Sequence, residues 1–159
     1  MTLLSRKADY ALLILSYLHR QNEGASAREV ADHFGLSRSF AANILKELCQ
    51  KGFVTSHRGV NGGYLLQRPA DEVTLGELLA SIEDGFHLAA CNDLTHDDAC
   101  SFSNICPMKT PMAEVHRRIV EVLGRVTLAE LFPATGTPHT GLTLPLLPPV
   151  AAVMEIESR

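Results

Sequence analysis

The chain has 159 residues, of which 46% are hydrophobic and 20% are charged, and this composition is enough for one domain or a small domain with an appended element. The formal net charge of −4 argues, taken alone, against nucleic acid as a partner. The charge is uneven, however. Residues 1–68 carry nine Lys or Arg and five Asp or Glu, a net of +4, whereas residues 69–159 carry five and thirteen, a net of −8. This asymmetry favours a basic contact module joined to an acidic one.

An apolar run, ALLILSYL, occupies residues 11–18. It is too short to span a bilayer, and neither flank has the pattern of a signal peptide. We therefore expect a helix over about residues 5–21 in a cytoplasmic protein. This helix is apolar on nearly all sides, which indicates burial on several sides and suggests a second chain. Thiols in that compartment stay reduced, so clustered cysteines there indicate metal or redox chemistry.

Two short helices follow. Ser26 and Glu29 form a capping box for a helix that stops at Gly35, and a second helix is expected from about Ser37 to Lys51. The side of this second helix expected to be buried consists of Phe40, Ala41, Ile44, Leu45 and Leu48. Its other face is polar and cationic, with Arg38, Ser39, Ala42, Asn43, Lys46 and Gln50.

The segment FVTSHRGVNGGYLLQRP, residues 53–69, changes to the alternation of a strand hairpin around a glycine-rich loop. Helix, short turn, helix and hairpin is the order of a winged helix-turn-helix, in which the second helix enters a major groove of DNA. A protein-interaction module with the same order is the main alternative. The candidate DNA-contacting residues are Ser37, Arg38, Ser39, Asn43, Lys46, Arg58, Asn61, Gly62, Gly63 and Tyr64.

The second half of the chain begins with a capping box at Thr74 and Glu77, whose helix is expected to reach about residue 84. Pro111 is expected to start a long helix over 111–126, and Thr127 to cap a short one. The apolar stripe of the long helix is Met112, Val115, Ile119, Val122, Leu123 and Val126. Residues 133–159 are rich in Pro, Gly and Thr, which predicts a disordered tail.

Three of the four cysteines lie between residues 91 and 106, in CNDLTHDDACSFSNIC. An odd number leaves one thiol over if a disulfide forms within this stretch. Thiolates are soft ligands that suit zinc, copper(I) or an iron–sulfur cluster, and the close C-x2–4-C pair usual in zinc sites is absent from this sequence. Cys49, near the end of the predicted recognition helix, is interpreted as a small buried hydrophobic residue.

Three sequence features together resemble the Rrf family of winged-helix regulators, which includes iron–sulfur cluster sensors of the IscR and NsrR types. They are LSRKADYALLILSYL, the segment SAREVADHFGLSRSFAANILKELCQKGFVTSHRGVNGGYLL, and the three cysteines that follow. The resemblance covers about residues 1–132. It implies a homodimer in which the long helix pairs with its mate, and a cluster held by Cys91, Cys100 and Cys106.

The resemblance leaves the fourth ligand open. The IscR branch has a His three residues after the last cysteine, where this chain has Lys109, a poor ligand. The NsrR branch uses an Asp of the first helix that reaches across the dimer, and Asp9 occupies a similar place. Asp9 is equally well explained as a carboxylate favoured near a helix N-terminus. Ligands could also come from the loop itself, from His96, Asp97 and Asp98.

The sequence thus predicts a mainly α-helical fold with a small β-wing: a winged helix-turn-helix plus a long dimerisation helix. The expected parts are the DNA-binding domain, residues 1–84, the cysteine loop, 85–110, the dimerisation and capping helices, 111–132, and the tail, 133–159. The function expected is that of a cytoplasmic, dimeric repressor that binds an inverted-repeat operator, and not that of an enzyme. An iron–sulfur cluster, [2Fe–2S] rather than [4Fe–4S], would control it by sensing iron–sulfur status, nitric oxide or oxidative stress. The alternatives are a metal-free thiol switch, a regulator with a structural metal, and a cysteine-based redox enzyme.

Overall fold

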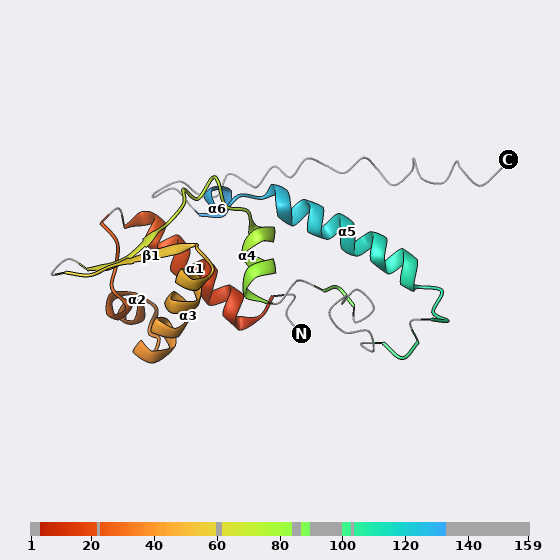
Figure 1. Ribbon diagram of the computed structural model, residues 1–159, viewed down its shortest axis with the longest axis horizontal. Helices are drawn as coiled ribbons and strands as arrows, with labels where there is room; N and C mark the ends of the chain where they lie inside the picture. The colour runs from red at the N-terminus through yellow and green to blue at the C-terminus, as the bar shows by residue number, and fades with distance from the viewer. Residues whose placement is uncertain are drawn as a thin grey trace.

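The computed structural model describes residues 4–21, 23–59, 62–83, 87–89, 100–102 and 104–132 (Figure 1). Its elements confirm a mainly helical fold with one two-stranded antiparallel sheet. In chain order they are α1 (Arg6–Arg20), α2 (Ala27–Phe34), α3 (Arg38–Gln50), β1 (Val54–His57), β2 (Gly63–Leu66), α4 (Leu75–Ile82), α5 (Lys109–Arg125) and α6 (Leu128–Leu131). None of the helices within the described ranges is long and apolar enough to cross a membrane.

Helix α1 forms the centre of the hydrophobic core. Ser5 caps its N-terminus, because the Ser5 hydroxyl accepts a hydrogen bond from the Ala8 backbone N–H at 3.2 Å. One side of the helix packs against α3, β2 and α4 and is almost completely shielded from solvent. The residues on that side are Ala8, Ala11, Ile14, Leu15 and Leu18.

Helices α2 and α3 form the predicted helix-turn-helix. The capping box is complete, because Ser26 accepts from the Glu29 N–H and the Glu29 carboxylate accepts from the Ser26 N–H. Gly35 ends α2 in the left-handed conformation, with φ of 65°, which glycine adopts without a steric penalty. Helix α3 buries Ala41, Ile44, Leu45 and Leu48.

One residue of the buried side of α3 was predicted wrongly. Phe40 is 39% exposed, and its ring packs edge-on against Tyr10 of α1, with ring centroids 5.0 Å apart. The helical periodicity places Phe40 at the margin of the apolar stripe, beside the buried Ala41 and Ile44. Phe40 therefore lies at the border between core and surface.

Strands β1 and β2 form the wing and pair in register, from Val54 opposite Leu66 to His57 opposite Gly63. Strand β2 is fixed to the domain by two backbone hydrogen bonds between Tyr64 and Ala25, of 2.8 and 3.0 Å. A Cβ on Gly63 would lie 2.9 Å from the Ala25 carbonyl group. This close approach explains the glycine at that position.

The starts of α4 and α6 are joined through the backbone. Leu75 donates to the carbonyl of Val126, and Leu128 donates to that of Val73, each at 2.8 Å. The predicted capping box at Thr127 is complete. At Thr74 the hydroxyl caps α4 as expected, but the carboxylate of Glu77 pairs with Arg68. The long-range arginine explains why this half of the predicted box does not form.

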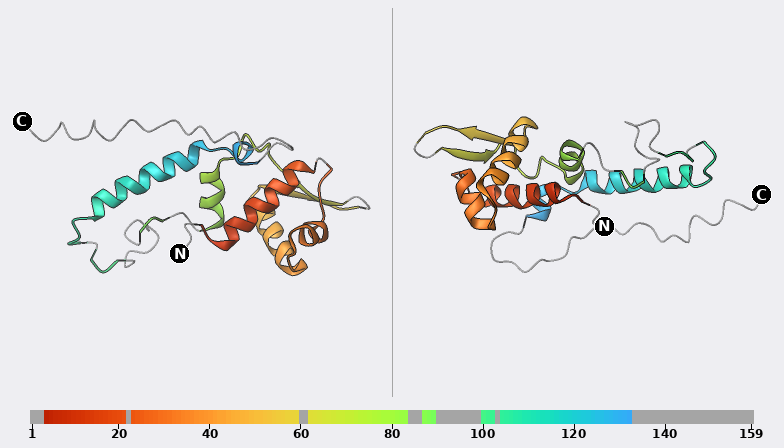
Figure 2. Two further views of the ribbon diagram at one scale, coloured as in Figure 1. Left: turned by 180° about the vertical axis from the view of Figure 1, so that it is seen from behind. Right: turned by 90° about the horizontal axis from the view of Figure 1, so that it is seen from below.

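Helix α5 extends away from the domain and packs against α4 (Figures 1 and 2). It begins at Lys109, two residues before the predicted start at Pro111. Proline is tolerated there because the first N–H groups of a helix have no intrahelical acceptor. Within the single chain no residue of α5 is buried, and Val115 of its apolar stripe is 45% exposed.

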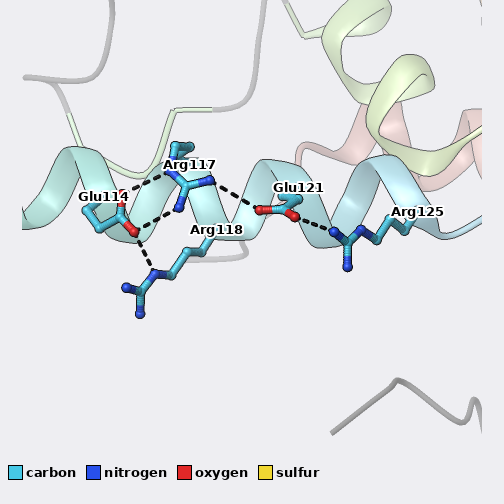
Figure 3. A network of polar contacts seen from close by, with 5 residues as sticks. All are labelled: Glu114, Arg117, Arg118, Glu121 and Arg125. Atoms are coloured by element: carbon cyan, nitrogen blue, oxygen red, sulfur yellow. Dashed lines mark hydrogen bonds and ion pairs between the residues drawn. The ribbon is translucent and has the colours of Figure 1, made fainter. Parts of the chain in front are cut away.

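A line of ion pairs spans the exposed surface of α5 (Figure 3). Glu114 accepts hydrogen bonds from Arg117 at 2.9 Å and from Arg118 at 2.8 Å, and Glu121 pairs with Arg117 and Arg125. Pairs three and four residues apart support a helix that lacks a buried face. The bonds from Arg117 and Arg118 lower the pKa of Glu114 to about 2.

We expect acid to weaken α5 through Glu114. The pKa of Glu114 is lower in the folded than in the unfolded state. Its stabilising effect is therefore complete above a pH of about 4.5 and is lost as the pH falls towards 2. Far-UV circular dichroism should show a loss of helix in this range that is smaller in Glu114→Gln. Glu72→Gln, a change of an exposed carboxylate outside α5, serves as the control. Identical acid titrations of the parent and Glu114→Gln would contradict this assignment.

Two predictions, one for the cysteine loop and one for the C-terminal tail, concern segments outside the described residues. These are the structure of most of the cysteine loop, including residues 84–86 and 90–99, and the disordered tail, 133–159.

Candidate nucleic-acid interface and cysteine site

The polar face of α3 is open to solvent, as a DNA-contacting face must be. Ser39, Asn43 and Lys46 are exposed and recur every three or four residues, on the side opposite the buried Ala41 and Leu45. The arrangement presents hydroxyl, amide and ammonium groups together on one surface. These groups bond base edges and phosphates, and a major groove is wide enough to admit the helix.

The N-terminus of α3 provides a second favourable feature. The Ser37 hydroxyl caps the helix by accepting from the Phe40 N–H at 3.3 Å, and it lies 3.3 Å from the Ser39 hydroxyl. The first turn contains no acidic residue, and Arg38 beside it is exposed. A helix N-terminus without a carboxylate attracts phosphate. Ser37 and Arg38 are therefore placed where a DNA backbone would approach.

The predicted wing residues fall into two groups. Arg58 is exposed just after β1, at the end of the hairpin that extends from the helices (Figure 1). Gly62 lies on the other side of the loop, where a Cβ would be 2.7 Å from the His57 carbonyl oxygen, and Asn61 lies outside the described residues. Gly63 and Tyr64 lie in β2, where the backbone meets Ala25, and the Tyr64 side chain packs against the core. Of the described wing residues, Arg58 is the cation best placed to reach DNA.

Two of the three clustered cysteines are described, and both are partly exposed thiols. Cys106 lies in a tight turn, where its N–H donates to the Phe102 carbonyl at 2.9 Å and its carbonyl accepts from the Lys109 N–H at 3.3 Å. It thus leads directly into the N-terminus of α5. Met108 supplies no side-chain cap there, and the first turn has no acidic residue. This uncapped, positive helix end favours an anionic group nearby.

The described residues do not bring the proposed ligands together. They contain no group of three or more His, Cys, Asp or Glu side chains arranged to hold a metal ion, while Cys91 lies outside them. Asp9 is exposed in the first turn of α1, on the side away from the core. Cys49 is half-buried and packs against the core, and burial raises the pKa of its thiol. That environment fits the structural interpretation of Cys49.

Sequence reasoning missed three contacts between distant parts of the chain. Lys7 of α1 forms an ion pair with Glu47 of α3, with 2.9 Å between Nζ and Oε1. The Ser5 backbone N–H donates to the Glu83 carboxylate at 2.7 Å. His87 and His116 lie with nearly parallel rings, their centroids 6.2 Å apart. Each contact joins residues far apart in the sequence, so no local pattern announces it.

Comparison with known proteins identifies the family to which this chain belongs. Residues 4–134 match the family model described as Rrf2, iron-dependent transcriptional regulator. The chain belongs to the Rrf2 family. It is 32% identical over 148 residues to Protein aau3 of Rhizobium meliloti (strain 1021), which covers 92% of this chain and 94% of that protein. It is also 28% identical over 130 residues to the transcriptional regulator NsrR of Bacillus licheniformis, covering 80% and 90% of the two chains.

The solved structures show the same fold. T. potens IscR superimposes with a TM-score of 0.62 and 26% identity, covering 80% of this chain and 84% of that one. CymR, the global cysteine regulator of B. subtilis, gives a TM-score of 0.63 and 25% identity, covering 82% and 96%. The protein is thus a winged-helix transcriptional regulator of a DNA-binding family. This result favours the regulator interpretation over both the redox enzyme and the protein-interaction module.

We expect the α3 face to divide into residues that read sequence and residues that bind the backbone. Lys46→Ala should weaken binding to all DNA and reduce the slope of log affinity against log salt by about 1, because one phosphate contact is lost. Asn43→Ala should cost roughly 1–3 kcal/mol on the operator and little on scrambled DNA. The measurement is a salt titration of affinity for both DNAs. Parental binding by both variants would contradict this DNA-binding face.

Proposed function

We propose that this protein is a homodimeric regulator whose affinity for an inverted-repeat operator is controlled by an iron–sulfur cluster. Repression is the expected outcome of operator binding. The observation that supports it most is the cluster of three cysteines, the last of which, Cys106, leads into the uncapped N-terminus of α5. This part of the proposal goes beyond the family assignment, since the family neighbours include both IscR and CymR.

The donor set fits an iron–sulfur cluster. Cys91, Cys100 and Cys106 would supply three thiolates, which are soft ligands for iron–sulfur clusters. A thiolate-ligated cluster is anionic, and the N-terminus of α5 with Lys109 in its first turn would stabilise that charge. When bound, the cluster would supply a redox-sensitive and nitric-oxide-sensitive group. [2Fe–2S] is favoured over [4Fe–4S], and Asp9 of the partner subunit is the proposed fourth ligand.

The exposed apolar surface of α5 supports the dimer. Val115, which belongs to the apolar stripe of α5, is 45% exposed. On α1, Leu13 is 44% exposed and lies four residues after Asp9, on the same side of the helix. Pairing α5 with its mate along this stripe would bury Val115. A dimer in which the outer face of α1 also meets the partner would bring Asp9 towards that subunit's cysteines.

Control of DNA binding requires that the cluster stabilise one arrangement of the dimer more than another. In this proposal the loaded loop holds α5 and α1 in the arrangement that spaces the two α3 helices for adjacent half-sites. Half-sites one helical turn of DNA apart, about 34 Å, or a multiple of it, match a two-fold protein. Loss of the cluster would release that arrangement and weaken operator binding.

A metal-free thiol switch is the second candidate. Cys100 and Cys106 are the two described cysteines of the loop, and both are free thiols with partly exposed side chains. The likeness to CymR, a cysteine regulator, supports a regulator of this kind. A disulfide between the two thiols, formed by loss of two electrons and two protons to an oxidant, would reshape the same turn before α5.

We expect protein purified without oxygen to be coloured and to contain iron and acid-labile sulfide. Cys91→Ser, Cys100→Ser and Cys106→Ser should each bleach it, because each removes one of three thiolates. Cys49→Ser is the matched control and should keep the colour. Visible absorption with iron and sulfide analysis measures the result. Colourless protein with stoichiometric zinc would contradict the cluster, and a Cys100–Cys106 disulfide in iron-free, active protein would favour the thiol switch.

Asp9→Ala tests the fourth ligand separately. The side chain is exposed, so the fold and dimer should persist, with a loss of at most about 1 kcal/mol from the helix-end charge. The cluster should become more labile to oxygen or show an altered spectrum. Glu23→Ala, an exposed carboxylate beyond the end of α1, controls for charge. If Asp9→Ala keeps the parental spectrum and lifetime, Asp9 acts only as a helix-end charge.

A further inference from the structure

The N-terminal part of α1 contacts both the end of α4, which leads to the cysteine segment, and the recognition helix α3. At its start, the Ser5 N–H donates to the carboxylate of Glu83 at 2.7 Å. Glu83 follows α4 directly and is the last described residue before the segment that leads to Cys91. Any rearrangement of that segment which pulls on Glu83 therefore acts on the N-terminus of α1.

On its other side, the same part of α1 contacts the recognition helix twice. Lys7 Nζ lies 2.9 Å from Glu47 Oε1, with 44% and 30% of the two side chains exposed. The rings of Tyr10 and Phe40 meet edge to face at an interplanar angle of 83°. Lys7 and Tyr10 are three residues apart on α1, and Phe40 and Glu47 are seven apart on α3. Each pair therefore shares one side of its helix.

These contacts lie beside the DNA-binding face. Phe40 is preceded by the exposed Ser39, and Glu47 by the exposed Lys46. Neither contact residue belongs to the buried stripe of α3, so their role is not explained by the core. A shift of α1 transmitted at two points seven residues apart would change the inclination of α3, whereas one contact would act only as a pivot.

We propose that Lys7, Tyr10, Phe40 and Glu47 are positioning residues that couple the cysteine segment to the DNA-binding face, with Glu83 as the link to α1. The coupling rests on the proposed function, because it supplies the route by which the cluster state alters operator affinity. The route lies within one subunit. It also includes Asp9, which faces outward from the same turns of α1. A ligand held by Asp9 would therefore act on the same N-terminal part of α1.

The first experiment measures operator affinity of cluster-loaded and iron-stripped protein and takes their ratio. Glu47→Gln and Glu83→Gln should each reduce this ratio about two- to fivefold, the range an exposed ion pair can transmit. Asp32→Asn is the matched control: it removes an exposed carboxylate that pairs with Arg28 within α2, so the ratio should remain parental. Exchanging the charges in Lys7→Glu with Glu47→Lys should restore the ratio. General changes in attraction to DNA cancel, because both states share them.

A second experiment does not depend on the cluster. In iron-stripped protein, Ser5→Ala removes the cap and loosens the first turn of α1. Its effect on operator affinity should shrink at least twofold in the Glu47→Gln background, because the contact through which it acts is already weakened. Additive effects would overturn the coupling. Non-additive effects in a protein that binds no iron would retain the coupling and reject the cluster. A parental loaded-to-stripped ratio in both Glu47→Gln and Glu83→Gln would reject the coupling while leaving the cluster in place.

Discussion

The structure depends on the burial of one side of α1. Five of its side chains are 0–2% exposed, and they contact the recognition helix, the second strand of the wing and α4. Burying such side chains contributes on the order of 1.5–3 kcal/mol for each large aliphatic residue, whereas the surface ion pairs around them contribute up to about 1 kcal/mol each. The core therefore fixes where α1 lies. In the proposed coupling, the weaker polar contacts at its N-terminal end would adjust the helices that it supports.

Local signals in the sequence predicted most of the fold. The predicted caps Ser26, Thr74 and Thr127 all accept backbone hydrogen bonds from the first turn of their helices, because capping depends only on residues within one turn. The wing was predicted by its glycines, and Gly63 is required by the close approach of Ala25. The same local reasoning located the polar face of α3, because helical periodicity separates a buried stripe from its opposite side.

What the sequence could not supply are contacts between distant residues. Glu77 looked like a capping residue but pairs with Arg68, and Phe40 looked buried but packs at the surface against Tyr10. The apolar stripe of α5 is not buried within the described part of one chain, although the helix packs against α4, so its periodicity indicated an interface rather than a core. The candidate cysteine site shows the same limit. Chemistry and spacing nominate the thiols, but the ligand set depends on a loop and a second subunit.

The two regions of the chain have different physical tasks. Residues 1–68 carry nine of the fourteen Lys and Arg residues and present short polar side chains on α3, which suits contact with a polyanion. The acidic second half carries the cysteines and the long helix α5, whose charged surface is neutralised internally by ion pairs. An anionic cluster at the N-terminus of α5 would thus be separated from the DNA, and its influence would have to pass through the protein.

The central claim is that the cysteine site controls DNA binding, and it is tested most directly by the operator affinity of one anaerobic preparation before and after its iron is removed. The account predicts tight, salt-dependent binding of the loaded dimer to an inverted repeat, and at least tenfold weaker binding after removal, which corresponds to about 1.4 kcal/mol of coupling. Reconstitution should restore the original affinity. Equal affinity in the two states, with the dimer intact in both, would contradict it.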